Sequence, residues 1–236
     1  MLDGYRPLVS RCHRSILLVL ALIGSLLIHP APLEASGPSQ PITQVRVVHA
    51  LPGTPAVDVF VDGARVLPGL AFGVAAPYIN LPAGVHEFTV VPVGAVPPTA
   101  ILTTGLDMAP GQPYTVMMIG APPAPPAALV LPDARFTPIG GPARVRFVHA
   151  SPNTPPLDVA VVGGTGLAAA LGFGEATPYV ELPAGTLSLE FRIAGTDTIA
   201  FVIPDTVLAV GTIYTFAAIG LAGATPPLGP LPLIDT

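Results

Sequence analysis

The chain has 236 residues, of which 51% are hydrophobic and 10% are charged, and its formal net charge at pH 7 is −5. It contains nine arginines and no lysine. Nucleic-acid binding and attachment to an anionic membrane surface both need clustered cations, so this composition excludes both functions.

The first expected element is an N-terminal export signal, which with a short spacer occupies residues 1–36. Arg11 and Arg14 precede an apolar run over residues 16–28, and small residues follow near position 36, which is the order typical of a secretory signal peptide. The run is shorter than the about 20 residues of a membrane-spanning helix. We expect no membrane span after cleavage, and an uncleaved anchor is the alternative. Cleavage would remove Cys12, the single cysteine, and with it any thiolate chemistry.

The rest of the chain is a tandem duplication. The segment QVRVVHALPGTPAVDVF, which starts at Gln44, returns as RVRFVHASPNTPPLDVA, which starts at Arg144. Two further blocks repeat in the same order, residues 71–84 as 172–185 and residues 113–120 as 213–220. A period near one hundred residues is too long for a solenoid repeat. It predicts two domains, at residues 43–136 and 143–236, joined by a linker at residues 137–142.

Each copy is expected to form an all-β, antiparallel, immunoglobulin-like sandwich, and only the export segment is expected to be helical. Short segments rich in Val, Ile, Thr, Tyr and Phe alternate with turns containing Pro and Gly, which is typical of strands. About seven short strands in one hundred residues is the pattern of a sandwich. The predicted strands are residues 45–50, 56–62, 76–81, 85–93, 99–106 and 114–120, and then 145–150, 157–162, 177–182, 186–193, 198–203 and 213–220.

The first hairpin turn differs between the copies. Asp62-Gly63 predicts a tight two-residue turn, because both residues tolerate a positive φ. The second copy has Gly163-Gly164 there. We therefore expect this hairpin to change its geometry in the second copy.

A histidine and an aspartate recur at the same places in both copies. They are His49, Asp58, His149 and Asp158. A His–Asp pair can orient an imidazole for nucleophilic catalysis, so a secreted hydrolase is one alternative function. The hydroxyl that would complete such a site, Ser151, corresponds to Leu51 in the first copy. We therefore predict no catalytic residue, and assign the four residues to structural roles at the strand-end turn.

Metal sites are not expected either. Zinc needs three or four ligands, whereas each copy repeats one histidine and one aspartate. A calcium set of Asp58, Asp62 and Asn80 lacks a recognisable ligand loop. No metal and no cofactor are predicted.

A tyrosine recurs in the block P-Y-x-x-L-P-A-G, as Tyr78 and Tyr179. A tyrosine beside a turn of a sandwich commonly packs its ring and binds a nearby backbone group through its hydroxyl, as in a tyrosine corner. The alternative is a ring that stacks on a sugar or another small ligand. The absence of tryptophan favours the structural role.

These ordered blocks resemble the "domain of unknown function 4397" family over residues 43 to about 135 and from 143 to the C-terminus. The resemblance implies an exported bacterial protein with tandem sandwich-like domains, and it implies no catalytic residue. Together these features predict a secreted or cell-surface, non-catalytic structural or adhesion-like module. Its partner would be an unknown extracellular protein or cell-envelope component, bound by edge strands or loops.

Overall fold

The computed structural model describes residues 40–121, 125–134 and 140–235. The expected export signal and residues 137–139 of the expected linker lie outside these ranges. Both copies belong to one compact unit, Ser39–Thr236. Within the described ranges, no helix has the length and apolar character needed to cross a membrane.

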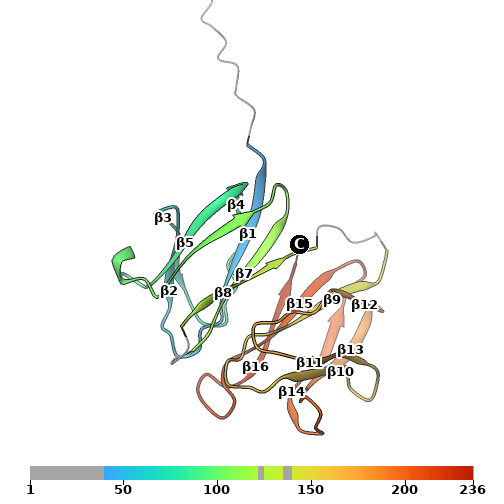
Figure 1. Cartoon of the computed structure of the whole chain (residues 1–236). Coiled ribbons are helices and arrows are strands. Elements are labelled where there is room, and N and C mark those ends of the chain that lie inside the picture. The colour runs from blue at the N-terminus through green and yellow to red at the C-terminus, as the bar shows by residue number, and fades with distance from the viewer. Residues whose placement is uncertain (1–39, 122–124, 135–139, 236) are drawn as a thin grey trace, which may run out of the picture. The chain divides into compact units, whose positions relative to one another are not determined.

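The first copy consists of two four-stranded sheets (Figure 1). One has the strand order β4-β1-β7-β8 and the other the order β3-β2-β5-β6. The strands are β1 (Ile42–His49), β2 (Val57–Val61), β3 (Ala64–Leu70), β4 (Ile79–Pro82), β5 (Gly84–Pro92), β6 (Leu102–Met108), β7 (Pro113–Ile119) and β8 (Ala127–Pro132). A single 3₁₀ turn, η1 (Pro97–Thr99), precedes β6.

The second copy repeats this topology strand for strand. Its sheets have the orders β12-β9-β15-β16 and β11-β10-β13-β14. The strands are β9 (Ala143–His149), β10 (Leu157–Val161), β11 (Gly166–Leu171), β12 (Val180–Leu182), β13 (Gly185–Ile193), β14 (Ile199–Leu208), β15 (Ile213–Ile219) and β16 (Gly229–Ile234). The expected all-β fold with two sandwich-like copies is confirmed.

The strand pairs are antiparallel except for one pair in each copy. β1 runs parallel to β7, with Val47 opposite Val116, and β9 runs parallel to β15, with Phe147 opposite Phe216. A strand pattern in the sequence does not indicate whether two strands pair in parallel or antiparallel. That depends on the path of the connections between them.

The predicted strand ranges leave out β3 and β8 of the first copy and β11 and β16 of the second. β3 contains Pro68 and Gly69, which weaken a strand signal but are tolerated at the edge of a sheet. β3 lies at such an edge and pairs only with β2, through a register that shifts twice.

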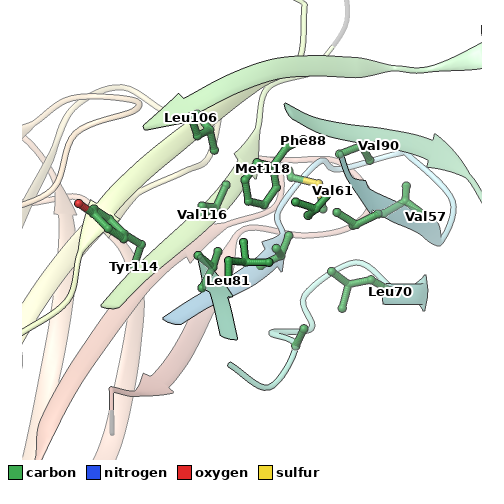
Figure 2. Close-up of a cluster of buried hydrophobic side chains, with 14 of the residues drawn as sticks. Val57, Val61, Leu70, Leu81, Phe88, Val90, Leu106, Tyr114, Val116 and Met118 are labelled. Atoms are coloured by element: carbon green, nitrogen blue, oxygen red, sulfur yellow. The ribbon is translucent and has the colours of Figure 1, made fainter. Parts of the chain in front are cut away.

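Each copy has its own hydrophobic core between its sheets. Figure 2 shows the core of the first copy, where Phe88 and Met118 lie among smaller aliphatic side chains. The strand registers place Leu189 and Ala218 at these two positions in the second copy. The second copy regains the volume elsewhere, with phenylalanines on β9, β13 and β15 where the first copy has valines. They are Phe147, Phe191 and Phe216, in place of Val47, Val90 and Val116. The copies keep a filled core by exchanging large and small residues.

A third hydrophobic cluster contains residues from both copies. It is built from the opposite faces of β1, β7 and β8 and of their counterparts β9, β15 and β16. Its buried members are Val48, Ala50, Met117, Ile119, Leu131, Val148, Ala150, Ala217, Ile219 and Leu233. The sheets that contribute to it are therefore buried on both faces, which explains the unbroken runs of buried residues 45–49 in β1 and 145–149 in β9.

The first hairpin has the expected geometry in the first copy. Asp62 and Gly63 alone connect β2 to β3, and both have positive φ, 51° and 78°, as a type I′ turn requires. In the second copy four residues, 162–165, connect β10 to β11. The predicted change of geometry is confirmed, because this turn is two residues longer than its counterpart in the first copy.

Candidate functional site

Both repeated histidines are completely buried, at the ends of β1 and β9. In the first copy, Nε2 of His49 lies 3.1 Å from the carbonyl oxygen of Pro55, and Nδ1 lies 3.2 Å from the amide nitrogen of Leu51. His149 makes the same two contacts at 3.1 and 3.3 Å. A carbonyl can only accept, and an amide N–H can only donate, so Nε2 carries the proton. Burial lowers the pKa of both histidines, which favours this neutral form.

The repeated aspartates bind backbone groups as well. Asp58 on β2 accepts hydrogen bonds from the amides of Gly69 at 2.8 Å and Gly94 at 3.4 Å. Asp158 accepts the two equivalent bonds at 2.7 and 3.0 Å. Donation from Gly69 lowers the pKa of Asp58, so the carboxylate is ionised at neutral pH. The histidine and the aspartate of each copy lie in different sheets, and each is bound by backbone groups.

The hydroxyls of the two repeated tyrosines bind carboxylates. Tyr78 donates to Asp133 at 2.6 Å, and Tyr179 donates to Asp235 at 2.9 Å. The sequence predicted a backbone partner, which is wrong, because β8 and β16 each end beside the tyrosine and are each followed by an aspartate. Burial, more than the nearby carboxylate, raises the pKa of both tyrosines well above its usual range, so both hydroxyls stay protonated.

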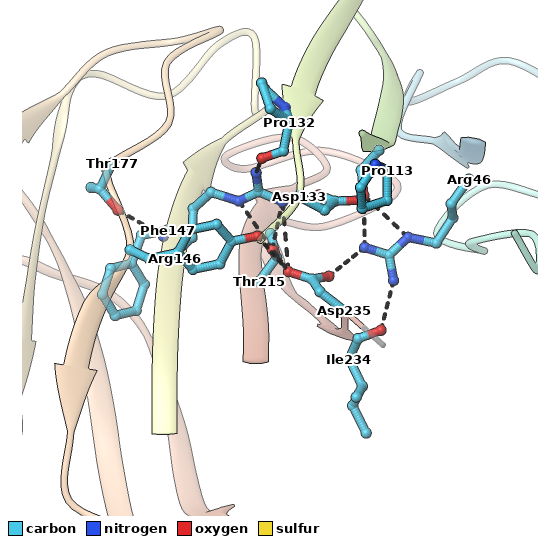
Figure 3. Close-up of polar contacts among 12 residues, drawn as sticks. Arg46, Pro113, Pro132, Asp133, Arg146, Phe147, Thr177, Thr215, Ile234 and Asp235 are labelled. Atoms are coloured by element: carbon cyan, nitrogen blue, oxygen red, sulfur yellow. Dashed lines mark hydrogen bonds and ion pairs between the residues drawn. The ribbon is translucent and has the colours of Figure 1, made fainter. Parts of the chain in front are cut away.

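The same two aspartates belong to a buried ionic cluster that joins the copies (Figure 3). Arg146 of the second copy donates to Asp133 at 2.7 Å and to the carbonyl oxygen of Pro132 at 2.9 Å, both in the first copy. Arg46 of the first copy donates to Asp235 and, at 2.9 Å, to the carbonyl oxygen of Ile234, both in the second copy. Each copy therefore gives the other an arginine and receives one.

Two threonines and the tyrosines complete this cluster. Thr115 donates to Asp133 at 2.7 Å and accepts from Arg46 at 2.7 Å. Thr215 does the same for Asp235 and Arg146, at 2.6 and 2.9 Å. The guanidinium groups of Arg46 and Arg146 also lie over the rings of Tyr78 and Tyr179, at 4.9 and 4.7 Å from the ring centres. Two positive and two negative charges balance, and their hydrogen-bonding groups are directed at one another.

The four charged members of this cluster were not predicted from the sequence. Arg46 and Arg146 stand at the same place in the repeated first block, and Asp133 and Asp235 stand at the same place after the last strand of each copy. This repetition of charge in an arginine-poor chain was the available signal. All four expose no more than 4% of their surface.

Among the described residues, His86 is the one buried histidine found in a single copy, and Leu187 corresponds to it in the second. Its Nδ1 lies 2.6 Å from the Asp62 carboxylate, and its Nε2 lies 2.8 Å from the carbonyl oxygen of Pro82. Both partners accept, so only the doubly protonated imidazolium can make both bonds. The bond to Asp62 raises the pKa of His86, and the same bond lowers the pKa of Asp62.

This pair predicts a pH dependence of stability. A raised histidine pKa contributes stability that is complete below the unfolded value of 6.5 and is lost as the pH rises through the folded value. The lowered pKa of Asp62 contributes stability above 3.8 that is lost on acidification. The contribution of the pair should therefore be greatest between these values. Since the Asp62 side chain is about half exposed, the contribution of this ion pair to the free energy of unfolding should stay within about 1 kcal/mol.

Urea unfolding of the wild type and of His86→Leu, which installs the residue of the second copy, measures this contribution. The difference in unfolding free energy between them should shrink from pH 5.5 to pH 8.5. A difference that is constant, or that grows with pH, would show that the imidazolium is not the stabilising form.

No group of three or more histidine, cysteine, aspartate or glutamate side chains suited to a metal ion occurs among residues 40–121, 125–134 and 140–235. The repeated polar residues instead fasten loops to strands and one copy to the other. Their chemistry, as the geometry shows it, is that of hydrogen-bonded and ion-paired structural groups.

Comparison with known families agrees with the repeat. The family model described as "Domain of unknown function (DUF4397)" matches residues 43–160 and again residues 149–236. The chain belongs to this family. The double match confirms tandem copies, and the first match extends into the opening block of the second copy. A search of curated proteins finds no match to the chain. The DUF4397 description names no activity, so it assigns no role to any residue of this chain.

Proposed function

We propose that this DUF4397 protein is an exported, non-catalytic interaction module, secreted or held at the cell surface. Its two copies form one body, and its exposed loops and sheet faces bind an extracellular protein or a component of the cell envelope. The basic-then-apolar order of the first residues supports export. The family description, which names no reaction, is compatible with a binding role.

One observation supports the non-catalytic role most strongly. The repeated histidines, and the aspartates that follow them on β2 and β10, are held in place by hydrogen bonds to backbone groups. Both ring nitrogens of His49 and of His149 are bound by backbone groups, and each oxygen of Asp158 accepts a backbone amide. A general base needs a free ring nitrogen within reach of its nucleophile.

The hydrolase alternative lacks this arrangement. The hydroxyl of Ser151 donates to the carbonyl oxygen of Gly220 at 2.8 Å and lies 2.6 Å from the hydroxyl of Thr154. Nδ1 of His149 accepts from the amide of Ser151 and not from its side chain. The observed contacts therefore favour a binding module over a Ser-His-Asp hydrolase.

The sugar-binding alternative would need accessible aromatic faces. Tyr78 and Tyr179 are half-buried, each ring faces a guanidinium group, and each hydroxyl is bound to a carboxylate. These contacts support a structural role for both rings.

Export is tested by expressing the full chain in a bacterial host and locating it by fractionation and by protease added to intact cells. We expect an extracytoplasmic protein whose N-terminus has been cut near residue 36. The matched control, Leu20→Arg, breaks the apolar run and should hold the chain in the cytoplasm. A wild-type chain that stays in the cytoplasm at full length would contradict the proposal.

A further inference from the structure

The second copy has a cavity on the outer face of its β11-β10-β13-β14 sheet. Its volume is about 390 Å³, and its lining includes Asp158, Ala160, Gly166, Glu190, Arg192 and Thr196. These residues belong to β10, β11, β13 and the turn after β13. The residues that alternate with them on β10 and β13, Val159, Leu189 and Phe191, belong to the hydrophobic core.

In the first copy, two side chains occupy the position that corresponds to this cavity. Phe60 lies opposite Arg65 in the β2–β3 pair, and the same register in the second copy puts Ala160 opposite Gly166. The second copy thus has a methyl group and a hydrogen where the first has a benzyl group and a guanidinium-bearing chain. Loss of these two side chains leaves the outer face open at this point.

The surroundings of the repeated aspartate, Asp58 in the first copy and Asp158 in the second, also differ between the copies. Asp58 is 2% exposed, and a guanidinium nitrogen of Arg65 lies 3.3 Å from its Oδ2. Asp158 is half-buried, and glycine stands in place of that arginine. Asp158 accepts one backbone amide at each oxygen, while a carboxylate has about four acceptor sites. Donation from Ala170 lowers the pKa of Asp158, so the carboxylate is charged at neutral pH.

A second carboxylate lines the cavity in this copy only. Glu190 takes the place of Thr89, since these residues lie opposite Ala160 and Phe60 in the two copies. Its side chain is 7% exposed and lies 2.6 Å from Arg192, which also lies 3.9 Å from the exposed Asp197. The cavity and its rim therefore hold more negative than positive charge. Nε of Arg192 is buried and has no hydrogen-bond partner within the described ranges.

We propose that this cavity binds an organic cation, a guanidinium or primary ammonium group carried on an apolar stem, in the place that Arg65 and Phe60 fill in the first copy. The cation pairs with Asp158 and Glu190, and a carbonyl or hydroxyl oxygen of the ligand accepts from Nε of Arg192. The inference rests on the proposed function as a binding module and names its ligand chemistry. An arginine residue of a partner polypeptide and a free guanidinium compound share this chemistry.

Calorimetric titration of the full mature chain tests the site with three probes. N-acetyl-arginine amide represents a polypeptide side chain, agmatine represents a free cation, and N-acetyl-glutamine amide is the uncharged control. We expect saturable one-to-one binding of the cationic probes that weakens as salt is added, because salt screens charge pairs. Tighter binding of the arginine amide would indicate a polypeptide source, and tighter binding of agmatine a free cation.

Two substitutions convert the cavity to the form of the first copy. Gly166→Arg supplies the missing guanidinium, and a Cβ added at this glycine meets no atom within 4 Å. Glu190→Thr installs the residue of the first copy. Each should weaken binding of the cationic probes at least about tenfold, equivalent to about 1.4 kcal/mol. Arg65→Gly, the matched change in the first copy, should leave the affinity of the second-copy site unchanged.

Urea unfolding of each variant separates loss of binding from loss of folding. If the wild type gives no saturable binding, if Gly166→Arg binds as the wild type does, or if the glutamine amide binds as well as the arginine amide, the proposal is overturned. Any of these results would overturn the proposed ligand chemistry but not the proposal that the protein is an exported binding module. Retention of the chain in the cytoplasm would instead refute the proposed function, whatever the titration gave.

Discussion

Replacing Arg146 by methionine is expected to lower the free energy of unfolding by about 3–5 kcal/mol, the range found when one partner of a buried ion pair is removed. The substitution keeps an apolar stem but removes the guanidinium that lies 2.7 Å from Asp133. Asp133 would keep the hydroxyls of Tyr78 and Thr115 and lose this cation. A charge left uncompensated in a site that is 3% exposed is the source of the cost. Urea unfolding of the variant and of the unaltered chain measures this loss.

Arg46→Met is the matched control for this experiment. It removes the cation that binds Asp235, but Arg146 remains 3.6 Å from that carboxylate. The loss should therefore be smaller than for Arg146→Met. The double substitution Arg146→Met with Asp133→Leu removes both charges and should recover part of the stability. If Arg146→Met unfolds within about 0.5 kcal/mol of the wild type, as an ordinary surface substitution does, the buried cluster does not hold the copies together.

His149→Ala is expected to cost about 2–6 kcal/mol, because it leaves one buried and one partly buried backbone group without partners, each worth about 1–3 kcal/mol. These groups are the carbonyl oxygen of Pro155 and the amide of Ser151. The substitution also removes a ring that meets Phe173 edge to face, at 6.3 Å between ring centres. Thermal and urea unfolding measure the loss.

His49→Ala is the matched substitution in the first copy. The same two backbone bonds are lost there, so a structural role predicts a loss of similar size. A catalytic role predicts a different result, in which His149→Ala folds with wild-type stability and a measurable activity disappears. That outcome would restore the hydrolase alternative.

The sequence predicted most of the strands, because alternating apolar residues and turn residues are local signals. Residues 85–93, for example, were predicted as a strand and correspond to β5 (Gly84–Pro92). The edge strand β3 was missed because Pro68 and Gly69 interrupt its apolar pattern. The parallel pairing of β1 with β7 could not be predicted, since both strands show the same pattern in either direction.

The sequence was less informative about the polar residues. Arg46 follows the alternation of β1 and reads as a solvent-facing residue, yet the second copy covers that face of the sheet. The separation of nine positions from His49 to Asp58 suggested that the two could meet, but the chain crosses from one sheet to the other between them. Neither outcome depends on local propensity. Both depend on how sheets and copies pack.

Equivalent positions of the two copies fall into two kinds, those that keep the same residue and those that differ. Positions that agree, such as His49 and His149, fasten loops and contribute to the fold in the same way twice. Positions that differ, such as Arg65 and Gly166, change the outer face of one copy only. In a duplicated binding module, specialisation of one copy is expected at the second kind of position.

The two copies, joined by reciprocal Arg–Asp pairs and a shared hydrophobic cluster, should unfold as one cooperative body. Scanning calorimetry of the unaltered chain should therefore give a single transition whose calorimetric enthalpy equals its van't Hoff enthalpy. Two separable transitions, each with the enthalpy of about one hundred residues, would instead show that the copies fold and unfold independently.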